Sequence, residues 1–263
     1  MRGKGEKGDG AGPEDAQLLS LVVPTRNESA TAPLLIARLA DVLADVPADV
    51  IFVDDSDDDT PQIIEREGAE SGLQVRVVHR DGVRRRGGLS TAVVEGIRAA
   101  GGRYVCIMDA DLQHPPDLII AMLRKAQDAD ADIVIASRNV RGGSDAGLNG
   151  LSRKAISWVA KWLVKALFPS RLRGVTDPLS GFFLVRRGLL ADTVLRPIGF
   201  KILLDILIRT DSARVKEVPL RFAPRAAGVS KATLSQGKDF LAHTLILFWH
   251  RRFDGAFRRR RSG

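Results

Sequence analysis

Residues 105–116 read Val105-Cys106-Ile107-Met108-Asp109-Ala110-Asp111-Leu112-Gln113-His114-Pro115-Pro116, an apolar run that ends in two acids and is closed by two prolines. The apolar part predicts a buried strand. Side chains two positions apart in a strand share a face, so the carboxylates of Asp109 and Asp111 can meet one divalent cation where this strand ends. Mg²⁺ and Mn²⁺ take oxygen ligands and commonly link one or two carboxylates to a substrate diphosphate. Two acids after a strand more often belong to an ordinary polar loop than to a cation site, so the assignment depends on the rest of the sequence.

Strand-like and helix-like segments alternate through the first half of the chain. We expect strands at 18–23, 50–53, 73–79, 104–108 and 132–137, with helices at 30–43, 90–100 and 117–127 and one that starts at Pro61. This alternation predicts an α/β fold with a mostly parallel central sheet and helices on both faces. Ligands of such sheets bind at the carboxyl ends of the strands. Polar or charged residues follow four of the expected strands, at 24–28, 54–59, 109–113 and 138.

The pattern changes beyond residue 140. Residues 141–150 are rich in Gly, Ser and Asn and predict a mobile loop, whereas residues 151–167 carry apolar side chains at helical spacing. Further strands are expected at 181–185 and 213–222, around a helix at 201–209.

Composition limits the partners and the compartment. The chain of 263 residues carries a net charge of +8, which indicates an anionic partner such as nucleic acid, a nucleotide or acidic lipid headgroups. Its single cysteine, Cys106, falls in an expected core strand, so no disulfide forms within the chain and a reducing compartment fits. Residues 1–17 are Gly-rich and charged, and we expect a disordered tail there without a signal peptide. No run reaches the roughly 18 apolar residues of a membrane span, so we expect a cytoplasmic protein that is at most peripheral to a membrane.

The C-terminal segment, residues 238–263, combines apolar and aromatic side chains with arginines at 258–261. An amphipathic helix with a basic end is typical of segments that lie on anionic membranes. We therefore expect a membrane-surface helix on the cytoplasmic face, where a lipid substrate would be within reach. The alternative interpretation is a core helix followed by a solvated tail.

Other features have structural interpretations that compete with functional ones. The acids at 57–59 suit a solvated turn at a helix start. The arginines at 84–86 predict either a solvated loop or a contact with a diphosphate. His114 is expected to be structural rather than a ligand. Trp158 and Trp162 lie four residues apart on one helix, which favours packing in the core or against a membrane over stacking on a sugar.

Seven short motifs, taken in order, resemble the family 2 glycosyltransferases, whose nucleotide-sugar fold is called GT-A. Three of them are Val23-Pro24-Thr25-Arg26-Asn27-Glu28, Val53-Asp54-Asp55-Ser56 and residues 109–116. The other four are Ala136-Ser137-Arg138, Asp177-Pro178-Leu179-Ser180-Gly181-Phe182-Phe183, Gly199-Phe200-Lys201-Ile202-Leu203-Leu204 and Arg225-Ala226-Ala227-Gly228-Val229-Ser230-Lys231. The later motifs look like the dolichol- or polyprenol-phosphate mannose synthase branch. The resemblance implies one glycosyltransferase domain over residues 18–237.

The resemblance also implies a role for each position. Pro24, Arg26 and Glu28 would line the nucleoside pocket, while Val53 and Asp55 would reach the base and ribose. Asp109, Ala110 and Asp111 would hold the donor diphosphate through Mg²⁺ or Mn²⁺, with Gln113 completing the metal shell. Arg138, Arg225 and Lys231 would neutralise phosphate charge, and the catalytic set would be Asp109, Asp111, Arg138 and Arg225. The acceptor phosphate would meet Arg138, Arg153, Ser157 and Arg225. Arg26 stands where the family usually has an aromatic residue, so a guanidinium plane would stack on the base instead.

The absence of a general base favours a phosphate acceptor. Related enzymes that act on sugar hydroxyls carry an acid at the start of the helix after the Gly-rich segment, and this chain has no acid there before Asp205. A phosphate monoester, whose second pKa is about 6, is already nucleophilic at neutral pH and needs arginine rather than a base. The resemblance therefore implies an inverting transfer of a hexose to a polyprenyl or dolichyl phosphate. Its branch implies mannose from GDP-mannose.

Alternatives stay open at this point. The same carrier could receive glucose from UDP-glucose, or the acceptor could be a sugar hydroxyl in glycan or natural-product assembly. A nucleic-acid-binding protein is a different class, and the acids at the strand ends argue against it because they repel phosphate in the absence of a metal. The expected partners are a nucleotide sugar, a polyprenyl phosphate and a membrane surface. A separate membrane subunit is a further candidate partner.

Overall fold

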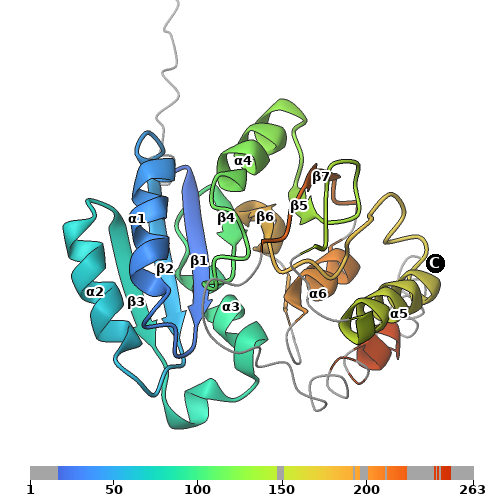
Figure 1. Ribbon diagram of the computed structural model, residues 1–263. Coiled ribbons are helices and arrows are strands. Elements are labelled where there is room, and N and C mark those ends of the chain that lie inside the picture. The colour runs from blue at the N-terminus through green and yellow to red at the C-terminus, as the bar shows by residue number, and fades with distance from the viewer. Residues whose placement is uncertain are drawn as a thin grey trace, which may run out of the picture.

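A seven-stranded sheet forms the centre of the computed structural model, which describes residues 17–146, 151–191, 193–195, 201–210, 212–223, 240, 242 and 244–249, without the side chains of 151–156. The strands are β1 (Leu19–Thr25), β2 (Ala48–Asp54), β3 (Gln74–His79), β4 (Tyr104–Ile107), β5 (Ile133–Ser137), β6 (Phe183–Arg186) and β7 (Val215–Pro219). They lie in the order β3-β2-β1-β4-β6-β5-β7 (Figure 1). β6 runs antiparallel to both of its neighbours, and the other paired strands are parallel. The predicted mostly parallel sheet is confirmed.

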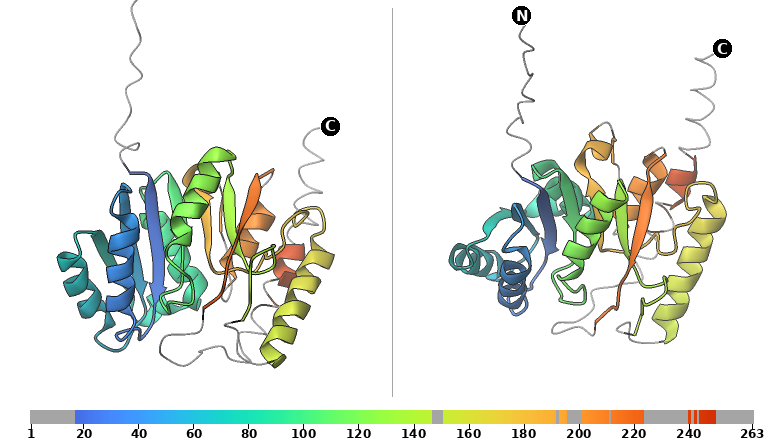
Figure 2. Two further views of the ribbon diagram at one scale, coloured as in Figure 1. Left: turned by 45° about the horizontal axis from the view of Figure 1, so that its top comes forward. Right: turned by 90° about the horizontal axis from the view of Figure 1, so that it is seen from above.

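Helices cover both faces of this sheet, as the alternation predicted. One face carries α1 (Ala32–Leu43), α2 (Thr60–Glu70) and α4 (Leu118–Asp128), and the other carries α3 (Gly88–Ala99) and α6 (Ile202–Arg209) (Figures 1 and 2). Two short 3₁₀ helices, η2 (Gly82–Arg85) and η3 (Arg187–Leu190), lie in connections. The long helix α5 (Leu151–Leu167) lies next to helical residues near the C-terminus, in all views of Figures 1 and 2.

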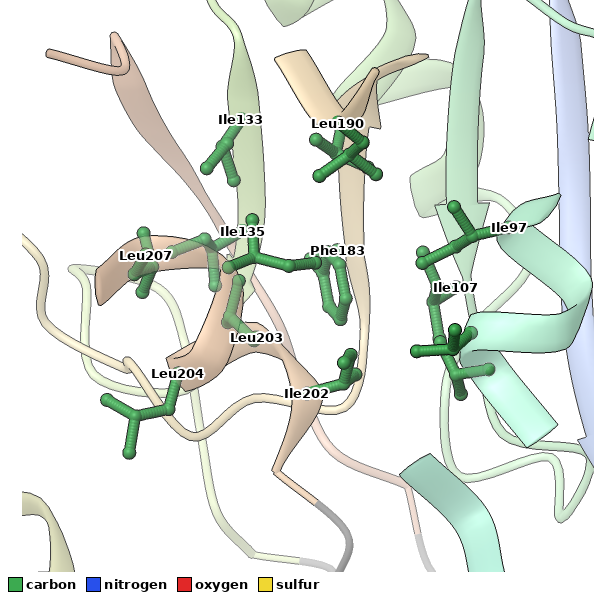
Figure 3. Packing of buried hydrophobic residues seen from close by; sticks show 14 of the residues in the cluster. Ile97, Ile107, Ile133, Ile135, Phe183, Leu190, Ile202, Leu203, Leu204 and Leu207 are labelled. Carbon is green, nitrogen blue, oxygen red and sulfur yellow. The ribbon is translucent and has the colours of Figure 1, made fainter. Parts of the chain in front are cut away.

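The strands contribute side chains to two hydrophobic cores, because successive side chains of a strand point to opposite faces of the sheet. In β1, Leu21 and Val23 join the core under α1, α2 and α4, whereas Val22 joins the core under α3 and α6. Figure 3 shows the second core, where Phe183 of β6 lies close to Ile202 of α6. Both faces of the five inner strands are therefore buried, which explains their continuous apolar runs, whereas the edge strands β3 and β7 are more exposed.

The strand order brings two of the predicted loops together. β1 lies between β2 and β4, and the chain crosses from one side of β1 to the other after β3. Ligands of open α/β sheets bind outside the strand ends at such a switch in direction. Pairing of β1 with β4 ends at Val22 opposite Ile107, so residues 24–28 and 109–113 leave the sheet next to each other.

Some predictions fall outside the described residues: the tail at 1–16, the end of the chain at 250–263, and the side chains of Arg153, Arg225 and Lys231. Within the described part of the chain, no helix has both the length and the apolar composition needed to cross a membrane.

Candidate active site

The two carboxylates of the predicted cation site lie directly after β4. The Asp109 side chain is 39% exposed, whereas Asp111 is buried. The Asp111 Oδ1 atom accepts a hydrogen bond from the Gln113 backbone N–H at 3.1 Å. Leu112, between Asp111 and Gln113, has a left-handed backbone conformation with a φ of 60°. This conformation costs a residue other than glycine about 1–2 kcal/mol. Strain of this kind is typical of turns whose geometry serves a function.

His114 holds the backbone of this turn in place. Its Nδ1 atom accepts a hydrogen bond from the Asp109 N–H at 3.2 Å, and its ring stacks on Phe182 with 5.0 Å between centroids. Burial lowers the pKa of His114 to about 4, although the charge of Asp111 opposes the shift. Because Nδ1 accepts, the neutral ring carries its proton on Nε2. These contacts support the structural role expected for His114.

The oxygen donors of the turn suit a hard divalent cation. Asp109 and Asp111 supply carboxylates, and the Gln113 Nε2 atom donates to the Ala223 carbonyl at 3.0 Å, which fixes the plane of that amide. Among the described residues, no three or more His, Cys, Asp or Glu side chains gather into a metal site. A cation here would therefore depend on the two aspartates and on oxygens of a bound diphosphate, as Mg²⁺ commonly does. The residues fit, and the assignment of Asp109, Asp111 and Gln113 as ligands stays a prediction.

Arg138, at the end of β5, is fixed by a buried aspartate. Its Nε atom donates to Asp177 Oδ2 at 2.7 Å, and its Nη2 atom donates to Asp177 Oδ1 at 2.9 Å. Burial raises the pKa of Asp177, but the hydrogen bonds and the charge of Arg138 outweigh it and hold that pKa below its ordinary value. The guanidinium also lies over the Phe222 ring, 5.8 Å from its centroid, and the same ring contacts His114 edge-on. Arg138 and the turn after β4 thus share one aromatic neighbour.

Residues 177–181 connect Arg138 to Asp109. Asp177 binds Arg138 at one end. At the other end Gly181 packs so closely that a Cβ atom there would lie 3.2 Å from Asp109 Oδ2. Between them, the Leu179 carbonyl accepts a hydrogen bond from Lys201 Nζ at 2.9 Å. Lys201 directly precedes α6, and no role was expected for it from the sequence.

Burial, followed by the charge of Arg138, lowers the pKa of Lys201 to about 8. Asp177 and Asp109 oppose the shift. The ammonium group therefore lies in the electrostatic field of three charged residues of the site.

The predicted nucleoside residues lie at the carboxyl ends of β1 and β2. Pro24 and Val53 are partners in the register of these two strands. Arg26 and Glu28 follow β1, and the Arg26 side chain is 61% exposed. The structure brings these residues to one edge of the sheet, and their contact with a nucleotide stays a prediction.

Asp55 is held by an arginine that the sequence analysis did not single out. Arg80 follows β3, is 1% exposed, and binds Asp55 through two bonds, Nε to Oδ1 at 2.7 Å and Nη2 to Oδ2 at 2.6 Å. Its Nη1 atom donates to the Thr91 hydroxyl on α3 at 3.0 Å. Arg80 therefore fixes the orientation of the Asp55 carboxylate, which the resemblance places at the base and ribose.

The basic loop after β3 binds acids of the protein itself. Arg85 pairs with Asp57 and donates through Nη2 to the Ser56 carbonyl at 2.6 Å, and Arg84 pairs with Glu95. Asp58 accepts a hydrogen bond from the Thr60 N–H at 3.1 Å, which supports its predicted place at a helix start. An open cavity of about 430 Å³ adjoins this loop, lined by Ser56, Asp57, Asp58, Pro61, Gln62, Glu65, His79 and Arg85. It lies beside the predicted nucleoside residues but is lined by none of them.

Helix α5 reaches the site through Lys161. Its Nζ atom donates to Asn139 Oδ1 at 2.9 Å, and Asn139 directly follows Arg138. Burial lowers the pKa of Lys161, and the charge of Asp177 opposes the shift. Ser157 lies one turn earlier on the same side of the helix and is half-buried. Contact of Ser157 and Arg153 with an acceptor phosphate stays a prediction, and Lys161 joins the residues that the sequence analysis missed.

The sequence held partial signals for the missed residues. Arg80 directly follows the strand expected at 73–79, and Asp177 and Lys201 lie inside motifs that were quoted for the resemblance. Burial of these charges was the missing information, because charged residues are almost never fully buried unless they are paired.

A mostly parallel α/β sheet with paired aspartates after its fourth strand defines the GT-A class of nucleotide-sugar transferases. The model of the family Glycosyl transferase family 2 matches residues 20–193, and the chain belongs to this family.

Known relatives extend the comparison beyond the family. The chain is 35% identical over 239 residues to a dolichol-phosphate mannosyltransferase of Pyrococcus furiosus, covering 90% of this chain and 65% of that protein. Proteins of the same description in Mycosarcoma maydis and Saccharomyces cerevisiae are 33% and 32% identical, covering 81% and 87% of this chain and 72% and 91% of theirs. The chain thus spans a little less than two thirds of the length of the Pyrococcus relative.

A solved structure supports the fold. Glucosyl-3-phosphoglycerate synthase from Mycobacterium tuberculosis, in complex with Mn²⁺, UDP-glucose and phosphoglyceric acid, matches with a TM-score of 0.64 and 24% identity. The match covers 88% of this chain and 80% of that one. At this identity the likeness concerns the fold alone.

Proposed function

We propose that this protein transfers mannose from GDP-mannose to a polyprenyl or dolichyl phosphate, with inversion at the anomeric carbon, and that the transfer requires Mg²⁺ or Mn²⁺. The observation that carries the proposal is the placement of Asp109 and Asp111 at the switch between β1 and β4, next to the paired Arg138. The descriptions of three relatives support the sugar and the acceptor.

The charges of the site suit a diphosphate leaving group. Asp109 and Asp111 would hold the cation, which when bound neutralises the negative charge that grows on the departing diphosphate. On the opposite side, Arg138 would bind oxygens of the acceptor phosphate, and Asp177 keeps its guanidinium in position. An arginine held in this way needs no rearrangement at the moment of reaction, which is where electrostatic stabilisation is most effective.

The groups expected near the acceptor are positively charged side chains rather than a general base. Lys161 and Lys201 both lie in the electrostatic field of Arg138 and Asp177. A phosphate acceptor needs charge neutralisation and orientation rather than the removal of a proton. This supports a lipid phosphate over a sugar hydroxyl as the acceptor.

We further propose that the protein works on the cytoplasmic surface of a membrane. Two tryptophans of α5, Trp158 and Trp162, are 64% and 62% exposed, so the interpretation that they pack in the core is wrong. On the neighbouring C-terminal helix, Leu245 and Trp249 are 53% and 56% exposed. Residues four apart share one side of a helix, so each helix presents an apolar side to solvent.

The two helices contact each other, and their charge suits an anionic lipid surface. Phe168, next to the end of α5, lies edge-on to Phe248 with 6.3 Å between ring centroids. Lys165 is exposed one turn after Trp162, on the same side of α5. Tryptophan prefers the membrane interface, and lysine near it attracts anionic headgroups. We name Trp158, Trp162, Leu245 and Trp249 the exposed apolar surface.

The proposal is tested by incubating the full chain with Mg²⁺ or Mn²⁺, polyprenyl phosphate in detergent, and radiolabelled GDP-mannose, UDP-glucose or GDP-glucose in separate reactions. We expect labelled lipid from GDP-mannose at the highest rate. Labelled lipid from UDP-glucose alone would replace the donor in the proposal, and no labelled lipid from any donor would reject the acceptor.

A further inference from the structure

The ammonium group of Lys201 lies between the two ends of the site. Residues 177–181 contact Arg138 through Asp177 and approach Asp109 through Gly181. Lys201 Nζ binds the carbonyl of Leu179, halfway along this segment, at 2.9 Å. The ammonium group is therefore held between the predicted cation site and Arg138.

The position of Lys201 is set by packing on its other side. The next residues, Ile202 and Leu203, are buried in the core behind the sheet, where Ile202 lies close to Phe183 (Figure 3). Phe183 begins β6, two residues after Gly181. The start of α6 thus packs against the strand into which the segment 177–181 leads, and this packing holds Lys201 near that segment.

We propose that Lys201 binds the acceptor phosphate together with Arg138, an inference that rests on the proposed function. For transfer, an oxygen of the acceptor must come within about 3–3.5 Å of the anomeric carbon of the bound donor. With the donor diphosphate at Asp109 and Asp111, the acceptor phosphate has to lie between these acids and Arg138. Lys201 is one cation among the described residues that borders this space, at its middle.

Electrostatics explains why a cation is needed at this point. The donor diphosphate and a dianionic acceptor phosphate repel each other strongly when brought within a few ångströms in a partly buried site. A guanidinium can bind a phosphate through two parallel bonds, while a lysine acts as a compact point charge. Because Asp177 already balances the charge of Arg138, Lys201 would add a further positive charge at the acceptor phosphate, while Arg138 would supply its remaining N–H groups.

The chemical step balances without any change at Lys201. The acceptor oxygen forms a bond to the anomeric carbon while the bond from that carbon to the donor diphosphate breaks. The electron pair of the broken bond leaves with the nucleoside diphosphate, and no proton is transferred. Lys201 therefore binds and orients the acceptor and keeps its proton throughout.

The test compares Lys201→Gln, which keeps a donor for the Leu179 carbonyl but removes the charge, with Lys201→Arg, which keeps the charge. Lys125→Gln on the exposed side of α4 is the matched control for the loss of one positive charge. For Lys201→Gln we expect the KM for polyprenyl phosphate to rise roughly ten- to a hundredfold, the usual effect of losing a charge-assisted hydrogen bond. The affinity for the nucleoside diphosphate with Mn²⁺, measured by calorimetry, should stay within twofold. Lys201→Arg should recover part of the acceptor affinity, and Lys125→Gln should match the wild type.

Two results would overturn the inference. One is an unchanged KM for polyprenyl phosphate in Lys201→Gln. The other is a loss that falls equally on nucleoside diphosphate binding, which would place Lys201 at the leaving group or in the structural core of the site. Failure of the proposed function is distinguishable from both, because in that case the wild-type protein itself forms no glycosylated lipid phosphate.

Discussion

Arg138 and Asp177 form a bidentate ion pair. The Asp177 carboxylate is fully buried, and the Arg138 side chain is 14% exposed. Neither residue is a neighbour of the other in sequence, and the pair joins the end of β5 to the segment before β6. It fixes Arg138, the arginine that we propose binds phosphate, beside the two aspartates that follow β4.

Asp177→Asn should destabilise the protein by about 3–5 kcal/mol, because it leaves most of the Arg138 charge buried without a counter-ion. Urea unfolding measures this loss, and steady-state kinetics should show a parallel fall in kcat/KM because the arginine is no longer held. Asp130→Asn, in the exposed pair with Arg214, is the control and should change stability little. Equal unfolding free energies for wild type and Asp177→Asn would contradict the structural role of the pair.

Asp111→Asn keeps the shape of the side chain and removes its charge. We expect kcat/KM to fall on the order of a thousandfold, because the charge that develops on the leaving diphosphate loses its stabilisation. The affinity for Mn²⁺ in the presence of nucleoside diphosphate, measured by calorimetry, should fall in parallel. Asp128→Asn at the exposed end of α4 should leave both unchanged. Wild-type turnover in Asp111→Asn would remove this residue from the reaction.

Replacing both Trp158 and Trp162 with serine should weaken binding to vesicles that contain anionic lipid by roughly tenfold or more, because two large apolar side chains leave the membrane interface. Their exposure means that the unfolding free energy should stay within about 0.5–1 kcal/mol of the wild type. Val83→Ser removes an apolar side chain that is 71% exposed near the opposite end of the sheet and serves as the control. Unchanged sedimentation of the double variant with vesicles would exclude α5 from the membrane contact.

His114 should make the stability of the metal-free protein depend on pH. Its pKa is about 4 in the folded protein and about 6.5 in an unfolded chain. Between these values the unfolded state binds more protons, so the unfolding free energy falls as pH drops from 6.5 toward 4, by about 3 kcal/mol in total. His114→Phe cannot titrate and should lose this part of the slope in urea unfolding across that range. Parallel slopes for the two proteins would show that His114 is not kept neutral by burial.

The fold followed closely from hydrophobic pattern, because most strands are buried on both faces and most helices are bounded by turn residues. The predicted helix at 151–167 has the bounds of α5, and the other elements differ by a few residues at their ends. The position of β6 between β4 and β5, antiparallel to both, could not be predicted. The apolar side chains of β6 point to both faces of the sheet. The same hydrophobic pattern would therefore arise for a parallel or an antiparallel strand, at any interior position of the sheet.

The site was predicted in part, for a similar reason. Asp109 and Asp111 carry a local signal, since their spacing alone places both carboxylates at one strand end. Arg80 and Asp55, and Arg138 and Asp177, are pairs between distant segments, and only the packed structure reveals which acid meets which arginine. The basic loop at 84–86 shows the limit most clearly, because Arg85 binds Asp57 and Arg84 binds Glu95 within the protein itself.

The central claim is that the acceptor is a phosphate rather than a hydroxyl, and one paired measurement tests it most directly. Full-length protein, Mn²⁺ and labelled GDP-mannose are incubated with a polyprenyl phosphate or with the polyprenol of the same length, and the lipid products are separated and counted. We expect label only on the polyprenyl phosphate, in a product that mild acid hydrolyses to free mannose. Label on the polyprenol at a comparable rate, or on neither lipid, would contradict it.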